Sequence, residues 1–109
     1  MSPDLGAASV LHTGATDLEE VVAELLPETG SVEVQRDTPG RAHPTHTHPT
    51  DETLHILAGT ITFEAEGRSS ECGPGDRLLL PRETPHSSIA GPRGCLYVIA
   101  FEIVSGTGG

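Results

Sequence analysis

Residues 40–59 read GRAHPTHTHPTDETLHILAG, and this stretch decides how the rest of the chain is interpreted. His46 and His48 stand two residues apart, and Glu52 follows shortly after them. Side chains alternate along a strand, so residues two apart lie on the same face. Two imidazoles and a carboxylate on one face are typical ligands of a divalent transition metal. His86 follows a GPGD turn and a short apolar run, and adds a third imidazole.

The composition limits the size of the core and the class of partner. With 109 residues, the chain is long enough for one domain and too short for two. Its formal net charge is -10, because 16 Asp and Glu residues stand against 6 basic residues, all of them arginine. A chain this acidic repels nucleic acids and anionic membranes, so the sequence predicts neither as a partner.

The sequence predicts a cytoplasmic protein of bacterial origin. The first residues, MSPDLGAASVLHTG, show neither the basic start nor the apolar run of a signal peptide, and no segment has the length of a membrane span. Cys72 and Cys95 lack the spacing of a zinc site, so we interpret both as reduced thiols. The Gly-, Ala- and Arg-rich composition without lysine indicates a bacterial source.

One helix is predicted near the N-terminus. Residues 1–15 are small and polar and are expected to form a flexible arm, with a short strand at 9–12. Thr16 offers a helix cap, and Glu19 completes a capping box three residues later. Pro27 ends the helix. An apolar stripe at helical spacing consists of Leu18, Val21, Val22, Leu25 and Leu26.

From residue 31 onward apolar residues recur at every second position, a pattern that predicts strands. Strands are expected at residues 31–36, 42–48, 53–57, 60–66, 77–81, 85–90 and 95–104. Turns are expected between them, among others at Ala58-Gly59 and in the GPRG sequence at 91–94. Short strands with regular turns predict an all-β antiparallel sandwich or barrel, with one domain over residues 16–104 and a disordered tail at 105–109.

The last predicted strand is apolar on both faces. One face can fill the interior of the barrel, whereas the other needs cover from a second sheet or subunit. We therefore predict a homodimer.

The histidine-rich stretch resembles the first motif of the cupin family. That motif is a glycine, five residues, His-x-His, three or four residues, Glu, six residues and a second glycine. Every gap is matched by Gly40, His46, His48, Glu52 and Gly59.

A second stretch resembles the second cupin motif, which is a glycine, five residues, Pro-x-Gly, two residues, His, three residues and Asn. Here it begins at Gly75, reaches Pro81 and places His86 at the histidine position. Glu83 stands at the glycine position and Ala90 at the asparagine position, so the turn before His86 is expected to differ in shape.

The resemblance implies a double-stranded β-helix, or jelly-roll barrel, with one divalent metal at its inner wall. The ligands that it implies are His46, His48, Glu52 and His86. Three neutral imidazoles and a carboxylate suit Fe, Mn, Ni or Zn, and the sequence does not decide among these metals. An octahedral ion would keep two positions open for a substrate or dioxygen.

Several functions remain open at this point. The leading hypothesis is a metal-dependent enzyme that acts on a small, mostly apolar organic molecule. With Fe it would be a dioxygenase, and with Mn, Ni or Zn a Lewis-acid isomerase, cyclase or lyase, in which Glu52 is a candidate general base. The alternatives are a non-catalytic module that binds or senses a metal or small molecule, and a purely structural metal site.

Strand alternation also predicts which side chains line the pocket around the metal. Two further histidines lie in the same stretch. His55 is expected to point away from the pocket and to be half exposed or at an interface. His43 is expected to be a solvated loop residue or a proton relay at the pocket mouth. The predicted lining residues are Leu54, Ile56, Ile61, Phe63, Ser88, Tyr97, Ile99 and Phe101.

Overall fold

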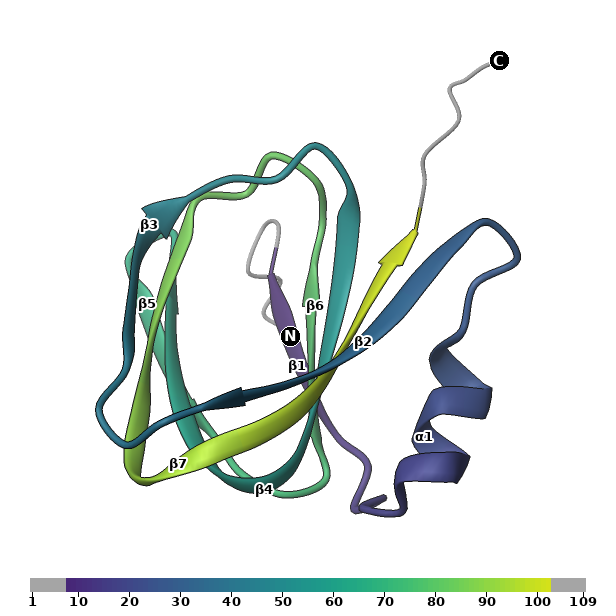
Figure 1. Cartoon of the computed structure of the whole chain (residues 1–109). Coiled ribbons are helices and arrows are strands. Elements are labelled where there is room, and N and C mark those ends of the chain that lie inside the picture. Colours follow the sequence, from purple (N-terminus) through teal and green to yellow (C-terminus); the bar gives the residue numbers. More distant parts are fainter. Residues whose placement is uncertain (1–7, 103–109) are drawn as a thin grey trace.

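A computed structural model describes residues 8–102, which form a β-barrel with one short helix outside it (Figure 1). This is the predicted jelly-roll architecture. The elements are β1 (Ser9–His12), α1 (Leu18–Leu25), β2 (Gly30–Asp37), β3 (Ala42–His46), β4 (Asp51–Ala65), β5 (Arg68–Cys72), β6 (Asp76–Leu80) and β7 (His86–Glu102). The predicted strand at residues 9–12 is β1, which pairs with β6. The predicted tail at 105–109 lies outside the described residues.

Two layers of antiparallel strands face each other, and the long strands β4 and β7 run through both. Residues 51–59 of β4 pair with residues 95–102 of β7, in a layer ordered β1-β6-β4-β7-β2. Residues 61–65 of β4 pair with residues 86–90 of β7, and β5 and β3 extend this second layer. One pair of strands therefore forms the middle of both walls.

Bends at Gly59 and Gly94 replace two of the predicted turns. We expected strands to end at Ala58-Gly59 and at residues 91–94, but β4 and β7 continue through both positions. Register shifts flank Gly59, which lies opposite Cys95, and both glycines have a φ of 76°. The prediction was wrong because a glycine can mark a bulge inside a paired strand as well as a turn between strands.

The apolar core lies between the two layers. Ile56 and Ile61, on either side of the bend in β4, are 0% and 1% exposed. The core as a whole consists of Ala8, Leu54, Ile56, Ile61, Phe63, Cys72, Leu78, Leu80, Ala90, Cys95, Tyr97 and Ile99. Aliphatic side chains dominate this set, as the low aromatic content requires.

The N-cap of helix α1 lies one residue later than predicted. Asp17 is the N-cap residue, and its carboxylate accepts a hydrogen bond from the backbone N–H of Glu20 at 2.9 Å. Thr16 and Glu19 do not form the expected capping box, because the neighbouring aspartate is an equally good cap with its own acceptor in place. Within residues 8–102, no helix is long and apolar enough to cross a membrane.

Polar contacts fix α1 to the outside of the barrel. Glu24 on α1 accepts a hydrogen bond from a terminal nitrogen of Arg77 at 2.6 Å. The Nε of the same guanidinium donates to Nδ1 of His55 at 3.0 Å. Because Nδ1 is an acceptor, Nε2 carries the proton, and it donates to the carbonyl oxygen of Ala15 at 2.7 Å. The buried imidazole thus links the segment before the helix to the sheet.

The environment of His55 corrects one prediction. It does not line the pocket around the other histidines, but it is 0% exposed rather than half exposed. Strand alternation gave its face correctly, but it did not show that α1 and the segment before it would cover that face.

The outer face of β7 is also covered from within the chain. Val98 on this face is 0% exposed, and α1 packs against both β4 and β7, with Val21 fully buried. The apolar outer face was the reason given for a homodimer, and the helix supplies part of the cover that a partner was expected to provide. Dimerisation stays a prediction.

The bend in β4 generates the first prediction. A Cβ at Gly59 would collide with the carbonyl oxygen of Gly94, whereas a Cβ at Gly67, which has a similar φ of 78°, would meet nothing within 4 Å. Both alanine variants adopt a left-handed backbone, which costs about 1–2 kcal/mol. The free energy of unfolding of Gly67→Ala should fall by no more than this. That of Gly59→Ala should fall by at least about 3 kcal/mol, because the collision adds to the backbone cost.

Urea denaturation of the two variants and the wild type measures the difference. Equal losses in Gly59→Ala and Gly67→Ala would contradict the close approach of β4 and β7 at the bend.

Candidate metal centre

Three histidines from separate segments meet at one end of the barrel. His46 is the last residue of β3, His48 lies in the loop two residues later, and His86 opens β7 opposite His46. One ring nitrogen from each residue lies within 4.8 Å of the others. The ring centroids are 4.7 Å apart for His46 and His48, 4.4 Å for His46 and His86, and 5.4 Å for His48 and His86. His48 was expected on a strand, but the loop brings it to the same place.

Backbone carbonyl groups orient two of the rings. Nδ1 of His46 lies 2.6 Å from the carbonyl oxygen of Pro44, and Nδ1 of His86 lies 2.9 Å from that of Thr84. A carbonyl only accepts, so each Nδ1 carries the proton and each Nε2 keeps a free lone pair. Hydrogen bonds of this kind orient metal-ligating histidines in proteins.

The electrostatic environment keeps two of these imidazoles neutral. Desolvation by burial lowers the pKa of His48, and the neighbouring histidines His46 and His86 lower it further. Burial also lowers the pKa of His86, although its hydrogen bond to Thr84 acts in the opposite direction. Neutral imidazole is the form that binds a metal, so the lowered pKa values of His48 and His86 favour metal binding near neutral pH.

Glu52 provides a buried carboxylate beside the histidines. Its side chain is 5% exposed, and burial raises its pKa to about 7. Its Oε2 atom lies 3.1 Å from Nδ1 of His48 but forms no hydrogen bond within the described part of the chain. A buried carboxylate oxygen without a hydrogen bond is costly unless a positive charge compensates it. Three free imidazole nitrogens and this unsatisfied oxygen therefore fit a divalent transition metal.

The four predicted ligands are not equally well assembled. The ring nitrogens of His46, His48 and His86 form one tight group. Glu52 stands next to His48 at the start of β4 but is not part of that group. The carboxylate stays a predicted fourth ligand.

A cavity of about 180 Å³ opens in front of the cluster. Its volume corresponds to about six water molecules, so only a small molecule fits. The lining residues are Gln35, His43, His46, His48, Glu52, Leu54, Phe63, His86, Ser88, Tyr97, Ile99 and Phe101. Two residues expected here, Ile56 and Ile61, lie in the core and do not line the cavity.

Gln35 and His43 also line the cavity, although the sequence does not predict Gln35 there and gives the pocket mouth as only one of two alternatives for His43. Between His43 and His46, three steps along β3 oppose two steps along β7, because His43 pairs with Ser88 and His46 with His86. This bulge shifts the alternation by one residue, so positions of opposite parity reach the same cavity. Pro44, which cannot donate to the ladder, was the signal that a regular strand is interrupted.

Of the two alternatives predicted for His43, the solvated loop residue is wrong. Its Nε2 lies 3.0 Å from Oδ2 of Asp37, whose side chain is 4% exposed. The hydroxyl of Tyr97 donates to the same oxygen at 3.1 Å. Burial raises the pKa of Tyr97, and the nearby Asp37 carboxylate raises it further, so the phenol stays protonated.

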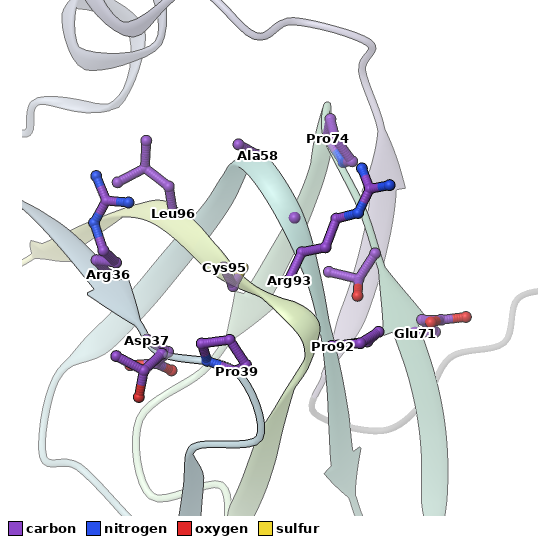
Figure 2. Close-up of a pocket in the computed structure, with 13 residues that line it drawn as sticks. Arg36, Asp37, Pro39, Ala58, Glu71, Pro74, Pro92, Arg93, Cys95 and Leu96 are labelled. Atoms are coloured by element: carbon purple, nitrogen blue, oxygen red, sulfur yellow. The ribbon is translucent and has the colours of Figure 1, made fainter.

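A larger cavity of about 770 Å³ lies at the bend of the barrel (Figure 2). Arg36, Arg93 and three prolines stand at its margin, and most of its lining residues are exposed. Within residues 8–102, the only group of three or more potential metal ligands lies in the smaller cavity. We therefore place the candidate site in the smaller cavity.

Comparison with known proteins places the chain in a family. The pattern of the cupin domain matches residues 33–92, which is more than half of the 109 residues. The chain belongs to the cupin family. The matched region of this cupin contains all of His46, His48, Glu52 and His86.

One relative is known by its activity. Over 50 residues this cupin is 40% identical to dimethylsulfoniopropionate lyase DddQ of Ruegeria pomeroyi, a match that covers 45% of this chain and 25% of the lyase. The crystal structure of that lyase aligns with a TM-score of 0.65 and 28% identity, over 70% of this chain and 39% of the other. The chain thus spans well under half the length of this relative.

Two further solved structures share the fold. The polyketide cyclase RemF from Streptomyces resistomycificus aligns with a TM-score of 0.58 and 27% identity, over 64% of this chain and 52% of the cyclase. A salicylate 1,2-dioxygenase from Pseudaminobacter salicylatoxidans aligns with a TM-score of 0.60 and 19% identity, over 66% of this chain and 21% of the other. At that identity, the likeness to the dioxygenase shows the fold alone.

The raised pKa of Glu52 generates the second prediction, for the metal-free protein. Because the folded-state pKa of about 7 exceeds the ordinary value of 4.5, the contribution of this group to stability is complete below about pH 4.5 and is lost as the pH rises through 7. Glu52→Gln is neutral and has nearly the same shape. With chelator at pH 8, the free energy of unfolding of this variant should exceed that of the wild type by about 1–3 kcal/mol, and this difference should vanish at pH 4.5.

Urea denaturation at several pH values checks this difference. Glu64→Gln changes an exposed carboxylate on the same strand and should alter the free energy of unfolding little at any pH. A wild type as stable as Glu52→Gln at pH 8 would contradict the buried, uncompensated carboxylate.

Proposed function

We propose that this cupin is a metal-dependent enzyme that removes a proton from a small, mostly apolar organic acid or carbonyl compound, in a lyase-, isomerase- or cyclase-type reaction. One observation carries the proposal: three imidazoles converge beside a buried carboxylate oxygen that forms no hydrogen bond within residues 8–102. This donor set in a small cavity favours a catalytic metal over a structural one, because structural sites are usually closed and rich in cysteine.

The relatives support proton chemistry more than oxygen chemistry. The two named enzymes with more than 25% identity are a lyase and a cyclase, whereas the dioxygenase contributes only its fold. Iron-dependent dioxygenase activity is therefore the second reading of the same site. Because the chain covers less than half of the lyase, the substrate of that enzyme is a probe to test and is not assigned here.

The residues of the proposed site have three roles, which are to hold the metal, to exclude water and to orient the ligand. His46 and His86 would hold the metal through Nε2 and His48 through a ring nitrogen, and Glu52 would offset its charge. A bound divalent metal supplies a Lewis acid that withdraws electron density from a carbonyl or carboxylate group. Apolar walls keep water from the reacting atoms, and they consist of Leu54, Phe63, Ile99 and Phe101. Gln35 and Ser88 provide the neutral polar groups that can orient a ligand.

The metal is proposed to be Fe, Mn, Ni or Zn, and a homodimer is the proposed assembly. Both are decided by measurement on the purified protein, namely elemental mass spectrometry for the metal and light scattering for the mass of the assembly. Neither result depends on knowing the substrate.

The third prediction concerns metal binding. His46→Ala and His86→Ala should each lower the metal content from about one ion per chain to less than about a tenth, because each removes a ligand. His12→Ala is the matched control, since His12 is exposed and pairs with Asp76 away from the cavity. Elemental mass spectrometry measures the content, and circular dichroism checks the fold. Variants that keep their metal would contradict the site, and variants that unfold would favour a structural metal.

The fourth prediction concerns the reaction. Metal-loaded protein should release dimethyl sulfide from dimethylsulfoniopropionate, or an unsaturated acid from related small acids with a leaving group at the β-carbon, and chelator should abolish this activity. Gas chromatography and absorbance of the unsaturated product follow the reaction. Oxygen uptake that depends on Fe(II), without elimination, would replace the proposal by a dioxygenase. A fully loaded protein that does neither would indicate a binding or sensing module.

A further inference from the structure

A hydrogen-bonded group of three side chains lies in the wall of the histidine cavity. Oδ2 of Asp37 is 3.0 Å from Nε2 of His43 and accepts a hydrogen bond from the hydroxyl of Tyr97 at 3.1 Å. Asp37 as a residue is 3% exposed, whereas the side chain of His43 is 30% exposed. Both His43 and Tyr97 line the cavity that contains the three clustered histidines. An aspartate that is buried behind a partly exposed histidine is the arrangement that orients a proton-transfer imidazole.

The contact with Asp37 fixes the roles of the two ring nitrogens of His43. A carboxylate accepts and an N–H donates, so Nε2 carries the proton in the neutral ring. Nδ1 then keeps its lone pair, and within residues 8–102 it has no hydrogen-bond partner. The ring, which belongs to a lining residue of the cavity, therefore keeps one free acceptor while its other nitrogen contacts a buried carboxylate.

We propose that His43, oriented by Asp37, is the residue that removes the substrate proton in this cavity. This inference rests on the proposed function and adds the residue that moves the proton. If Glu52 offsets the charge of the metal, its lone pairs are engaged and another base is needed. Tyr97 does not qualify, because its hydroxyl donates to Asp37 and its pKa is raised.

The step balances without a further reactant. The bond between hydrogen and the α-carbon of the substrate breaks, and the proton goes to Nδ1 of His43. The electron pair of that bond forms the new double bond to the β-carbon, and the leaving group departs with the pair of the bond that held it. Asp37 stabilises the imidazolium that results, since its carboxylate contacts Nε2. His43 then returns the proton to solvent or to the leaving group.

The chain contains a matched control for this pair. His12 and Asp76 form a second histidine–aspartate contact, with Nδ1 and Oδ1 2.6 Å apart, but the His12 side chain is 76% exposed and does not line the cavity. His12→Gln therefore removes an imidazole beside a carboxylate without touching the site.

Turnover of the elimination probes by zinc-loaded variants is the first test. His43→Gln keeps a donor for Asp37 but cannot take a proton, so kcat should fall about 10²- to 10⁴-fold. Asp37→Asn should lower kcat about 10- to 100-fold, because it removes the charge that holds the ring. In both variants the metal content and KM should stay within about threefold of the wild type. His12→Gln should match the wild type. A kcat of His43→Gln within about threefold of the wild type overturns the proposal.

A second measurement tests the positioning role of Asp37 without a substrate. Nitrogen-15 NMR of the zinc-loaded protein should show the His43 ring as a single tautomer with the proton on Nε2, and Asp37→Asn should give a mixture of tautomers. A proton on Nδ1 in the wild type overturns the proposal. If the loaded wild type turns over none of the probes, the proposed function fails. The role of His43 as the base then fails with it, and the tautomer results decide only whether Asp37 orients the ring.

Discussion

The structure depends on one continuous pairing, between β4 and β7, which bends over at Gly59 and Gly94. Glu52 pairs with Phe101 at one end of this ladder, and His86 pairs with Ala65 at the other. In a flat sheet, Glu52 and His86 would lie at opposite ends of the ladder. Because the ladder bends, its ends face each other across the barrel and line one cavity. The bend therefore assembles the site as well as the fold.

Alternation in the sequence was sufficient to predict the barrel, and the two motifs were sufficient to predict the family and three histidines that lie together. His46, His48 and His86 could be found because their residue type and their spacing can be read from the sequence. The errors arose where tertiary contacts override a local rule. Glycine at 59 looked like a turn, but pairing with β7 carried the strand through it. For His43 the sequence leaves two alternatives open, a solvated loop residue or a residue at the pocket mouth, because the bulge at Pro44 that brings it to the cavity depends on pairing with β7.

The histidines of this cupin occupy two very different environments. Three of them present ring nitrogens to a cavity, where the proposed metal would bind. His55 has both ring nitrogens engaged, by Arg77 and by the carbonyl of Ala15, so it serves packing. His43 lies between these extremes, with one nitrogen bound and one free. The hydrogen-bond partners of each ring, more than its position in a motif, separate structural from functional histidines.

Tyr97 is the only tyrosine of a chain that has no tryptophan. Its hydroxyl is bonded to Asp37, and its ring lines the histidine cavity. The near-ultraviolet absorbance and the intrinsic fluorescence of the protein therefore come mainly from one ring in the wall of the site. Occupancy of the cavity can be followed with the unlabelled protein, because any ligand that enters changes the surroundings of that single chromophore.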